Sequence, residues 1–214
     1  MNIIEERIFI EGENKIGATI SRPDDKKRPL VLLIMGTGKL DRDGNMKGFK
    51  TNLYKNMSDM FVNMGYVCIR YDKRGTHESS GNLKTAGLSD LVNDSASVIE
   101  YAKTLPYVDE HRIVACGHSE GSMIATLLTN QTKLDRIILL GGACMCLKSA
   151  MEYQNFKLLD EFKDKKGFLA WILNKTMSKE KVKKQLNSLY EKAKNAKKDT
   201  FFFRGAWLAA IYGL

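Results

Sequence analysis

The chain has 214 residues, of which 43% are hydrophobic and 28% charged, a composition typical of one sizeable globular domain. No apolar run is long enough to cross a bilayer, and Met1 to Arg7 lack the basic and apolar regions of a secretory signal peptide. These features argue against a membrane protein, and we expect a cytoplasmic location.

The net charge of +9 is concentrated in one segment of the chain. Residues 148–204 contain 15 basic and 7 acidic residues, whereas the remainder contains 19 and 18. Charge alone would allow a nucleic-acid partner, but the segment has no recognised binding motif and few interleaved aromatic residues. We therefore expect a solvated helical face and no nucleic-acid partner.

The first half of the chain alternates between strand and helix patterns. Residues 5–11 and 15–21 alternate apolar and polar side chains and predict a β-hairpin. Residues 30–35 form a continuous apolar run, which is typical of a central parallel strand covered on both faces. Apolar residues at helical spacing predict a helix over 53–64, and 67–71 form the next predicted strand.

The alternation continues to residue 140 and defines the fold class. We predict a helix over 88–105, a strand over 112–116, a helix over 122–130 and a strand over 134–140. Strands alternating with helices predict an α/β fold with a doubly wound, mostly parallel sheet.

The pattern changes after Ala143. Residues 148–198 are expected to be helical only, and no apolar run typical of a further strand follows them. The aromatic-rich run 200–207 is consistent with core packing or with the roof of an acyl pocket. We therefore divide the chain into a core, residues 1–146, and a helical, Lys-rich cap or lid segment, residues 147–214.

The strongest local signal is the run Gly117-His118-Ser119-Glu120-Gly121, which follows a predicted strand and precedes a predicted helix. Strand, G-x-S-x-G and helix together form a nucleophile elbow. The turn is so sharp that side chains at the two glycines would collide with neighbouring backbone. The elbow holds the serine hydroxyl above the carboxyl edge of the sheet, at the start of a helix.

Three motifs in chain order resemble those of the α/β-hydrolase superfamily, in the branch of dienelactone-hydrolase-like and S9/S33-like esterases and serine peptidases. Residues 35–38, with 41–45, look like the oxyanion loop of that family. Residues 71–75 resemble its Asp-x-Arg-Gly turn, and residues 117–121 resemble its elbow. The resemblance covers residues 30–142, and the helical segment that follows looks like the family's cap.

The resemblance implies a serine hydrolase that acts on carboxylic esters. Ser119 would attack an acyl carbonyl, and the backbone N–H groups of Thr37 and Glu120 would form the oxyanion hole. No metal or cofactor is needed for this chemistry. A serine peptidase, an acyltransferase of the same fold and a non-catalytic binding module remain alternatives.

The sequence departs from the family at the residues that complete a catalytic triad. The family's order is Ser, acid and then His, but no histidine follows Ser119. The resemblance therefore implies a C-terminally incomplete hydrolase fold with weak or no activity. Of the histidines present, His77 lies at the correct sheet edge, where the family has a glycine. His118 is turned away from the nucleophile, and His111 lies at the far edge.

The remaining expectations concern partners and thiols. The partner is a small-molecule acyl ester, with no membrane. An incomplete sheet would expose an edge, and we expect a homodimer through it. Cys68, Cys116, Cys144 and Cys146 lack the spacing of a zinc site and are expected to be free thiols.

Overall fold

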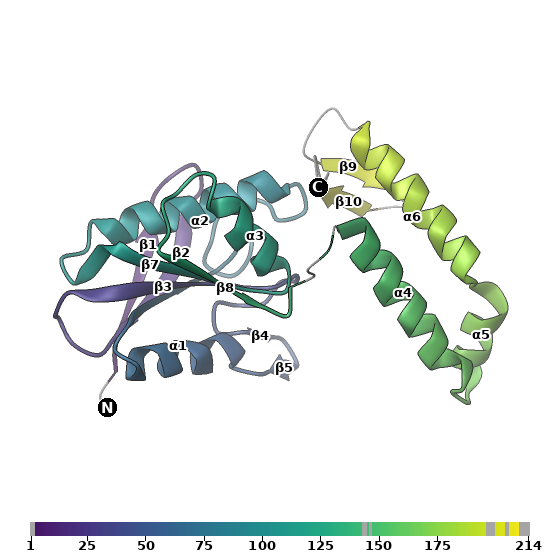
Figure 1. Cartoon of the computed structure of the whole chain (residues 1–214), viewed down its shortest axis with the longest axis horizontal. Helices are drawn as coiled ribbons and strands as arrows, with labels where there is room; N and C mark the ends of the chain where they lie inside the picture. Colours follow the sequence, from purple (N-terminus) through teal and green to yellow (C-terminus); the bar gives the residue numbers. More distant parts are fainter. Residues whose placement is uncertain (1–2, 143–144, 146, 196–199, 204–205, 210–214) are drawn as a thin grey trace. The chain divides into compact units, whose positions relative to one another are not determined.

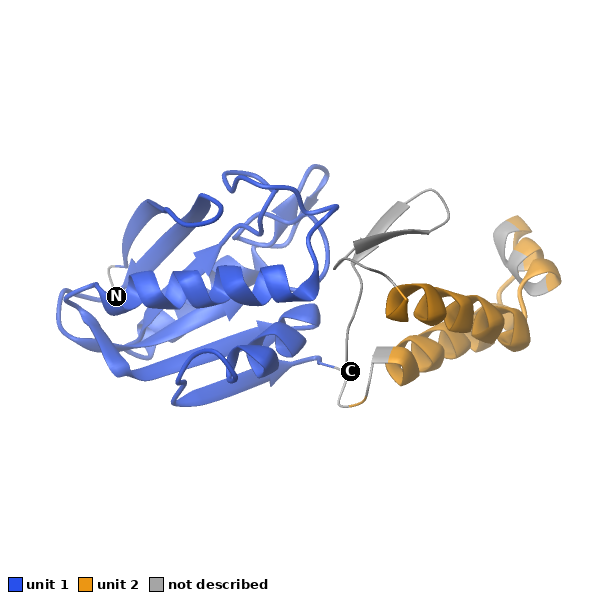
Figure 2. Cartoon of the chain, turned by 90° about the horizontal axis from the view of Figure 1, so that it is seen from above, with its two compact units in different colours: residues 1–142 blue, residues 143–214 orange. Residues whose placement is uncertain are grey.

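The chain folds into two compact units, residues 1–142 and residues 143–214 (Figure 2). The computed structural model describes residues 3–142, 145, 147–195, 200–203 and 206–209, the last two segments by their backbone alone. The sequence placed the boundary between residues 146 and 147, four residues after the boundary between the units. Cys144 and Cys146 lie outside the described residues.

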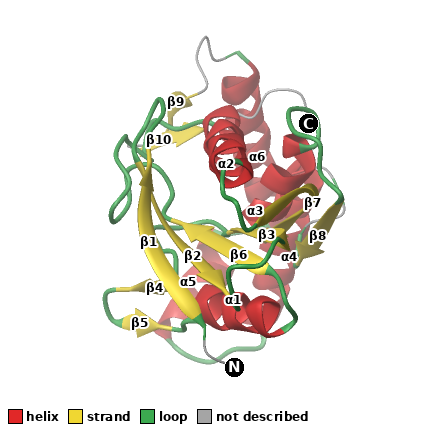
Figure 3. Ribbon diagram, turned by 90° about the vertical axis from the view of Figure 1, so that its left-hand side faces the viewer, coloured by secondary structure: helices red, strands yellow, loops and turns green. Residues whose placement is uncertain are grey.

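The first unit is built on a six-stranded sheet with three helices (Figures 1 and 3). In spatial order its strands are β1 (Ile4–Ile10), β2 (Ile16–Arg22), β6 (Val67–Tyr71), β3 (Arg28–Ile34), β7 (Val108–His118) and β8 (Arg136–Leu140). The β1–β2 and β2–β6 pairs are antiparallel, and the other three pairs are parallel. The predicted doubly wound, mostly parallel sheet is confirmed.

Helices cover both faces of this sheet. Helix α1 (Leu53–Asn63) lies on one face, and α2 (Leu88–Lys103) and α3 (Glu120–Leu128) lie on the other (Figure 1). Each face has its own apolar core, and β3 serves both because its successive side chains point to opposite faces. This two-sided burial explains why β3 is a continuous apolar run in the sequence.

Strand β7 is longer than the predicted strand 112–116. Its first residues, Val108 and Asp109, pair with Arg28 and Pro29 of β3, and the register then shifts so that Leu30 faces Ile113. The residues left out of the pairing are polar, so no apolar run in the sequence predicts this part of the strand. A short hairpin of β4 (Asn45–Met46) and β5 (Phe49–Lys50) lies in the loop before α1.

The second unit contains α4 (Leu147–Lys163), α5 (Phe168–Thr176), α6 (Lys179–Lys194), β9 (Thr200–Phe203) and β10 (Ala206–Ala209). The helical prediction for 148–198 is confirmed within its described residues, but the expectation that no strand follows is wrong. Strands β9 and β10 pair with each other in an antiparallel two-stranded sheet. The aromatic residues of β9 favour an extended backbone, although the segment is too short to be recognised as a sheet strand.

Strand β8 forms one edge of the six-stranded sheet. Within the described residues, no strand pairs with its outer edge. Its apolar residues Ile137, Leu139 and Leu140 are all exposed, Leu139 by 46%. An apolar edge with unpaired backbone groups favours pairing with another chain. No helix among the described residues has the length and apolar character that crossing a membrane requires.

We predict that this edge causes concentration-dependent self-association and that Leu139→Lys reduces it. A lysine on an edge strand opposes strand pairing because the new strand would bury its charge. Sedimentation velocity over a concentration series measures the effect. Met64→Lys, which adds the same charge at a residue 66% exposed after α1, is the matched control. A monomer at all concentrations in the unchanged chain would contradict the prediction.

Candidate active site

Ser119 lies in the sharp turn between β7 and α3. Its backbone has φ 55° and ψ −116°, a conformation that residues other than glycine rarely adopt. Such strain persists only where neighbouring contacts hold it in place. Here the Ser119 N–H donates to Leu140 O at 2.8 Å, and Ser119 O accepts from Ser122 N–H at 3.0 Å. Ser119 therefore has a strained backbone that is anchored to β8.

Two glycines make the turn sterically feasible. A Cβ atom at Gly117 would overlap the carbonyl group of Gly121, and one at Gly121 would overlap the carbonyl oxygen of Ile34. Both clashes would be with backbone, which cannot rotate away as a side chain can. The physical reason given for the glycines from the sequence alone is thus confirmed.

The loop after β3 lies directly against the elbow. A Cβ atom at Gly36 would lie 3.0 Å from the Cβ atom of Ser119. The Gly36 N–H donates to Tyr54 Oη at 2.8 Å, and Gly36 O accepts from Lys73 Nζ at 2.6 Å. Both backbone polar groups of Gly36 are therefore fixed by side chains of other segments.

The two residues predicted to form an oxyanion hole occupy neighbouring segments. Thr37 follows Gly36 and is exposed, and Glu120 is the first residue of α3. Within the described part of the chain, neither Thr37 N–H nor Glu120 N–H donates a hydrogen bond. Unpartnered N–H groups beside a serine are what an oxyanion hole requires, and their role stays a prediction.

Four charged side chains are buried where β6 ends and its loop begins. Arg70, Asp72, Lys73 and Arg74 are each no more than 7% exposed at the side chain. All four are paired: Arg70 with Asp43 and Glu5, Asp72 with Arg42, Lys73 with Glu120, and Arg74 with Asp90 and Asp94. Removing one partner of a buried pair typically costs about 3–5 kcal/mol, so these pairs hold the loops around Ser119 in place.

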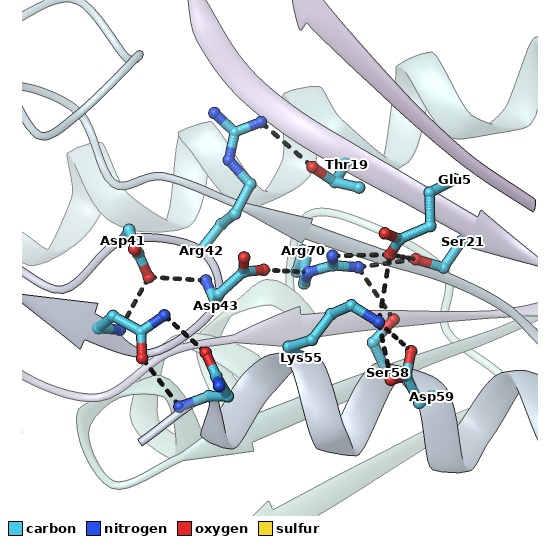
Figure 4. A network of polar contacts seen from close by, with 12 residues as sticks. Glu5, Thr19, Ser21, Asp41, Arg42, Asp43, Lys55, Ser58, Asp59 and Arg70 are labelled. Carbon is cyan, nitrogen blue, oxygen red and sulfur yellow. Dashed lines mark hydrogen bonds and ion pairs between the residues drawn. The ribbon is translucent and has the colours of Figure 1, made fainter. Parts of the chain in front are cut away.

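Figure 4 shows the contact between Arg70 of this cluster and Asp43 of the loop before α1. Arg70 Nε donates to Asp43 Oδ1 at 2.6 Å, and Arg42 Nη2 donates to Asp72 Oδ2 at 2.6 Å. Asp41 accepts hydrogen bonds from the backbone of its own loop, at Asp43 N–H and Asn45 N–H. The loop carboxylates and Arg42 therefore have structural partners.

An open hollow with a volume of about 370 Å³ lies beside these ion pairs. Its lining is mostly charged and includes Arg42, Asp72 and His77, but not Ser119. Sites for acyl groups are predominantly apolar, so this hollow does not have the character of an acyl pocket. No cluster of three metal-ligating side chains is found among the residues that the structure describes.

None of the three histidine side chains forms a hydrogen bond with Ser119 in the described structure. His118 is the closest in sequence, but its Nδ1 lies 3.0 Å from Tyr54 Oη. Burial raises the pKa of Tyr54, so its hydroxyl keeps its proton and can donate it to His118 Nδ1. The expectation that His118 is turned away from the nucleophile stays a prediction. The link of His118 to Tyr54 carries no sequence signal.

His77 and His111 are exposed. His111 lies near the start of β7, as predicted. His77 has φ 45°, a left-handed conformation, and its Nε2 lies 3.4 Å from Lys39 O. The family's glycine at this position would adopt that conformation without strain. His77 is therefore a turn residue in this structure.

The two described cysteines, Cys68 and Cys116, are free and buried. Burial raises the pKa of Cys116 to about 11, so this thiol remains protonated at neutral pH. Although Cys116 lies only three residues before Ser119, it does not compete with Ser119 as a nucleophile.

Comparison with known proteins agrees with this geometry. A sequence model described as serine aminopeptidase, S33, matches residues 48–206. Esterase EstD of Thermotoga maritima is 24% identical over 126 residues, which are 59% of this chain and 30% of EstD. This chain therefore matches less than a third of that relative's length.

Two solved structures resemble the chain in fold. The alpha/beta hydrolase GrgF from Penicillium sp. sh18 has a TM-score of 0.57 at 15% identity, covering 75% of this chain and 53% of that one. Est1E from Butyrivibrio proteoclasticus, solved with ferulic acid bound, has a TM-score of 0.55 at 18% identity, covering 95% and 67%. At these identities the likeness concerns the fold, which is that of an α/β-hydrolase.

We predict that Gly121→Ala destabilises the chain by about 3 kcal/mol or more, at or beyond the upper end of typical overpacking costs. The added methyl group would overlap backbone of β3, which cannot move without disrupting the sheet. Urea unfolding followed by circular dichroism measures the loss. Gly12→Ala is the matched control, since its Cβ atom would meet Asn14 O at an ordinary 3.7 Å. Equal stability of the two variants would contradict the elbow geometry.

Proposed function

The chain belongs to the serine aminopeptidase, S33, family, and we propose that it cleaves carboxylic esters through an acyl-enzyme on Ser119. The observation that carries the proposal is the strained, anchored conformation of Ser119 between two obligatory glycines. A turn of this kind serves to expose a nucleophile. The choice of esters rests on EstD, which is named an esterase, and on the ferulic acid bound to Est1E.

The chemistry follows from the residues that surround the elbow. Ser119 Oγ attacks the carbonyl carbon of the ester, and its proton passes to a base. The carbonyl oxygen becomes an oxyanion, which the N–H groups of Thr37 and Glu120 stabilise. The bond to the alcohol then breaks, and the alcohol leaves with a proton. Water attacks the acyl-enzyme in turn, releasing the acid and restoring the Ser119 hydroxyl.

The histidine side chains of the described structure form no hydrogen bond with Ser119 that would identify the base. His77 Nε2 lies near Lys39 O of the loop after β3, and His118 Nδ1 lies near Tyr54 Oη, so neither has a described hydrogen bond to Ser119. We therefore propose that the chain alone turns over slowly. Loss of the triad histidine typically lowers turnover by about 10⁴- to 10⁶-fold while the oxyanion hole retains some catalysis.

Three alternatives differ from this proposal in what Ser119 does. A serine peptidase, which the family description favours, would form the same acyl-enzyme from an amide. An acyltransferase would pass the acyl group to an alcohol or amine faster than to water. A binding module would leave Ser119 unreactive and use the basic helices of residues 147–214 for an acidic partner.

The remaining proposals concern partners and location. The chemistry above takes a small acyl ester as its substrate and needs no cofactor. The exposed β8 edge supports a homodimer. Buried free thiols such as Cys68 suit a reducing compartment, and a cytoplasmic location stays a prediction.

We predict that a fluorophosphonate probe labels Ser119 slowly but specifically. Oγ forms a bond to phosphorus, fluoride leaves, and the hydroxyl proton is released. Peptide mapping by mass spectrometry identifies the modified residue, and Ser119→Ala should abolish the label. Absence of labelling in a folded sample would contradict the hydrolase proposal and favour a binding module.

We further predict that added imidazole accelerates labelling in proportion to its neutral form. A free imidazole can accept the Ser119 proton that no described histidine reaches. The acceleration should therefore rise with pH through the pKa of imidazole and should be absent in Ser119→Ala. Fast labelling without imidazole, lost in His77→Ala or His118→Ala, would show instead that the chain supplies its own base.

A further inference from the structure

The Lys73 side chain connects the three motifs that surround Ser119. Lys73 is 4% exposed at its side chain, and its Nζ donates to Gly36 O at 2.6 Å and to Glu120 Oε2 at 2.5 Å. Gly36 belongs to the loop after β3, and Glu120 is the residue after the nucleophile. An ammonium group with two short hydrogen bonds of this kind fixes both of its acceptors.

The bond to Gly36 O has a consequence for the next residue. Gly36 C=O and Thr37 N–H belong to the same peptide group, which is planar and trans, so the two bonds point in opposite directions. By holding the oxygen on one side, Lys73 directs the Thr37 N–H to the other side. The positive charge also draws electron density toward the oxygen, which makes the Thr37 N–H a stronger hydrogen-bond donor.

The preceding peptide group is fixed as well. Gly36 N–H donates to the hydroxyl of Tyr54, which is 2% exposed and belongs to α1. The loop therefore cannot rotate about Gly36 without losing a buried hydrogen bond. Its position against Ser119 is set by Tyr54, and the orientation of its next peptide group is set by Lys73.

We propose that Lys73, held by the carboxylate of Glu120, is a positioning residue for the oxyanion hole. The Gly36–Thr37 peptide supplies one donor, and the backbone N–H of Glu120 supplies the other. One ion pair thereby couples the two donors, which come from separate segments of the chain. This inference rests on the proposed serine hydrolase function, and it gives the Glu120 carboxylate a role that the sequence alone did not suggest.

The test compares Lys73→Met, Glu120→Gln and the double variant Lys73→Met/Glu120→Gln. The double variant removes both charges at once, so it leaves no unpaired carboxylate if the single variant folds poorly. Lys73→Arg retains a positive donor and should recover part of the loss. Lys55→Met is the matched control, because Lys55 pairs with Asp59 and Glu5 on α1 and β1, away from the elbow.

The first readout is the backbone amide resonance of Thr37 in ¹⁵N-labelled full-length chain. A hydrogen bond to a carbonyl oxygen deshields the amide nitrogen of the following residue. We expect the Thr37 nitrogen to move upfield in Lys73→Met and in the double variant, and to stay in place in Lys55→Met. This readout requires no reaction at Ser119.

The second readout is the labelling of Ser119 by the fluorophosphonate probe over a range of probe concentrations. Complete loss of one oxyanion donor lowers rates by about 10²- to 10³-fold, so misdirecting one donor should lower the limiting rate by about 10- to 100-fold. The probe concentration at half the limiting rate should change little. A loss of general stability would not lower the limiting rate while leaving the probe concentration at half that rate unchanged.

The outcomes separate the inference from the function on which it rests. If the probe labels Lys73→Met as fast as it labels the unchanged chain, the role of Lys73 is overturned and the hydrolase proposal stands. The same holds if the Thr37 resonance does not shift in Lys73→Met. If the unchanged chain is folded but unlabelled, the hydrolase proposal is overturned. If the Thr37 resonance then still shifts in Lys73→Met, the result supports the hydrogen bond by which Lys73 orients the Gly36–Thr37 peptide group.

Discussion

The hydrogen bonds of the buried Lys73 ammonium are the contacts on which the arrangement around Ser119 depends. Gly36 follows β3 and Glu120 follows β7, and the Lys73 side chain donates a hydrogen bond to each of them. Its neighbours Asp72 and Arg74 attach the same turn to the loop before α1 and to α2. Because a buried charge must be paired, each of these side chains holds the segments that it contacts in one position.

The structure contains the nucleophile elbow and the loop against it, but no described histidine side chain is hydrogen-bonded to Ser119. The nucleophile elbow and the loop against it are built from the rigid centre of the sheet, where backbone strain at Ser119 can be supported. The base comes from a different part of the fold in the family that the sequence resembles. Presentation of a serine and its activation are thus physically independent, and the first does not require the second.

Much of the fold could be predicted from the sequence because burial leaves a periodic pattern. Strand β3 is covered on both faces and is therefore a continuous apolar run, and the elbow glycines are required by backbone contacts. The polar start of β7 and the short β9–β10 hairpin have no such pattern, and neither could be predicted from the sequence.

The side-chain partners within the site could not be predicted. The sequence placed Lys73 in a turn and Glu120 in an elbow, but nothing in their spacing indicates that they form an ion pair, because the pairing depends on how two loops meet in space. The contact between Tyr54 and His118 is equally non-local. Such contacts depend on how distant segments meet in the fold, whereas a sequence motif reports only on residues that are neighbours in the chain.

The most direct test of this account is a crystal structure of the chain with a phosphonate bound covalently to Ser119. The account predicts that the phosphonyl oxygen lies about 2.7–3.1 Å from both the Thr37 and Glu120 backbone nitrogens, with Gly36 O still on Lys73 Nζ. An oxygen directed elsewhere, or a Gly36–Thr37 peptide group turned away from Lys73, would contradict it.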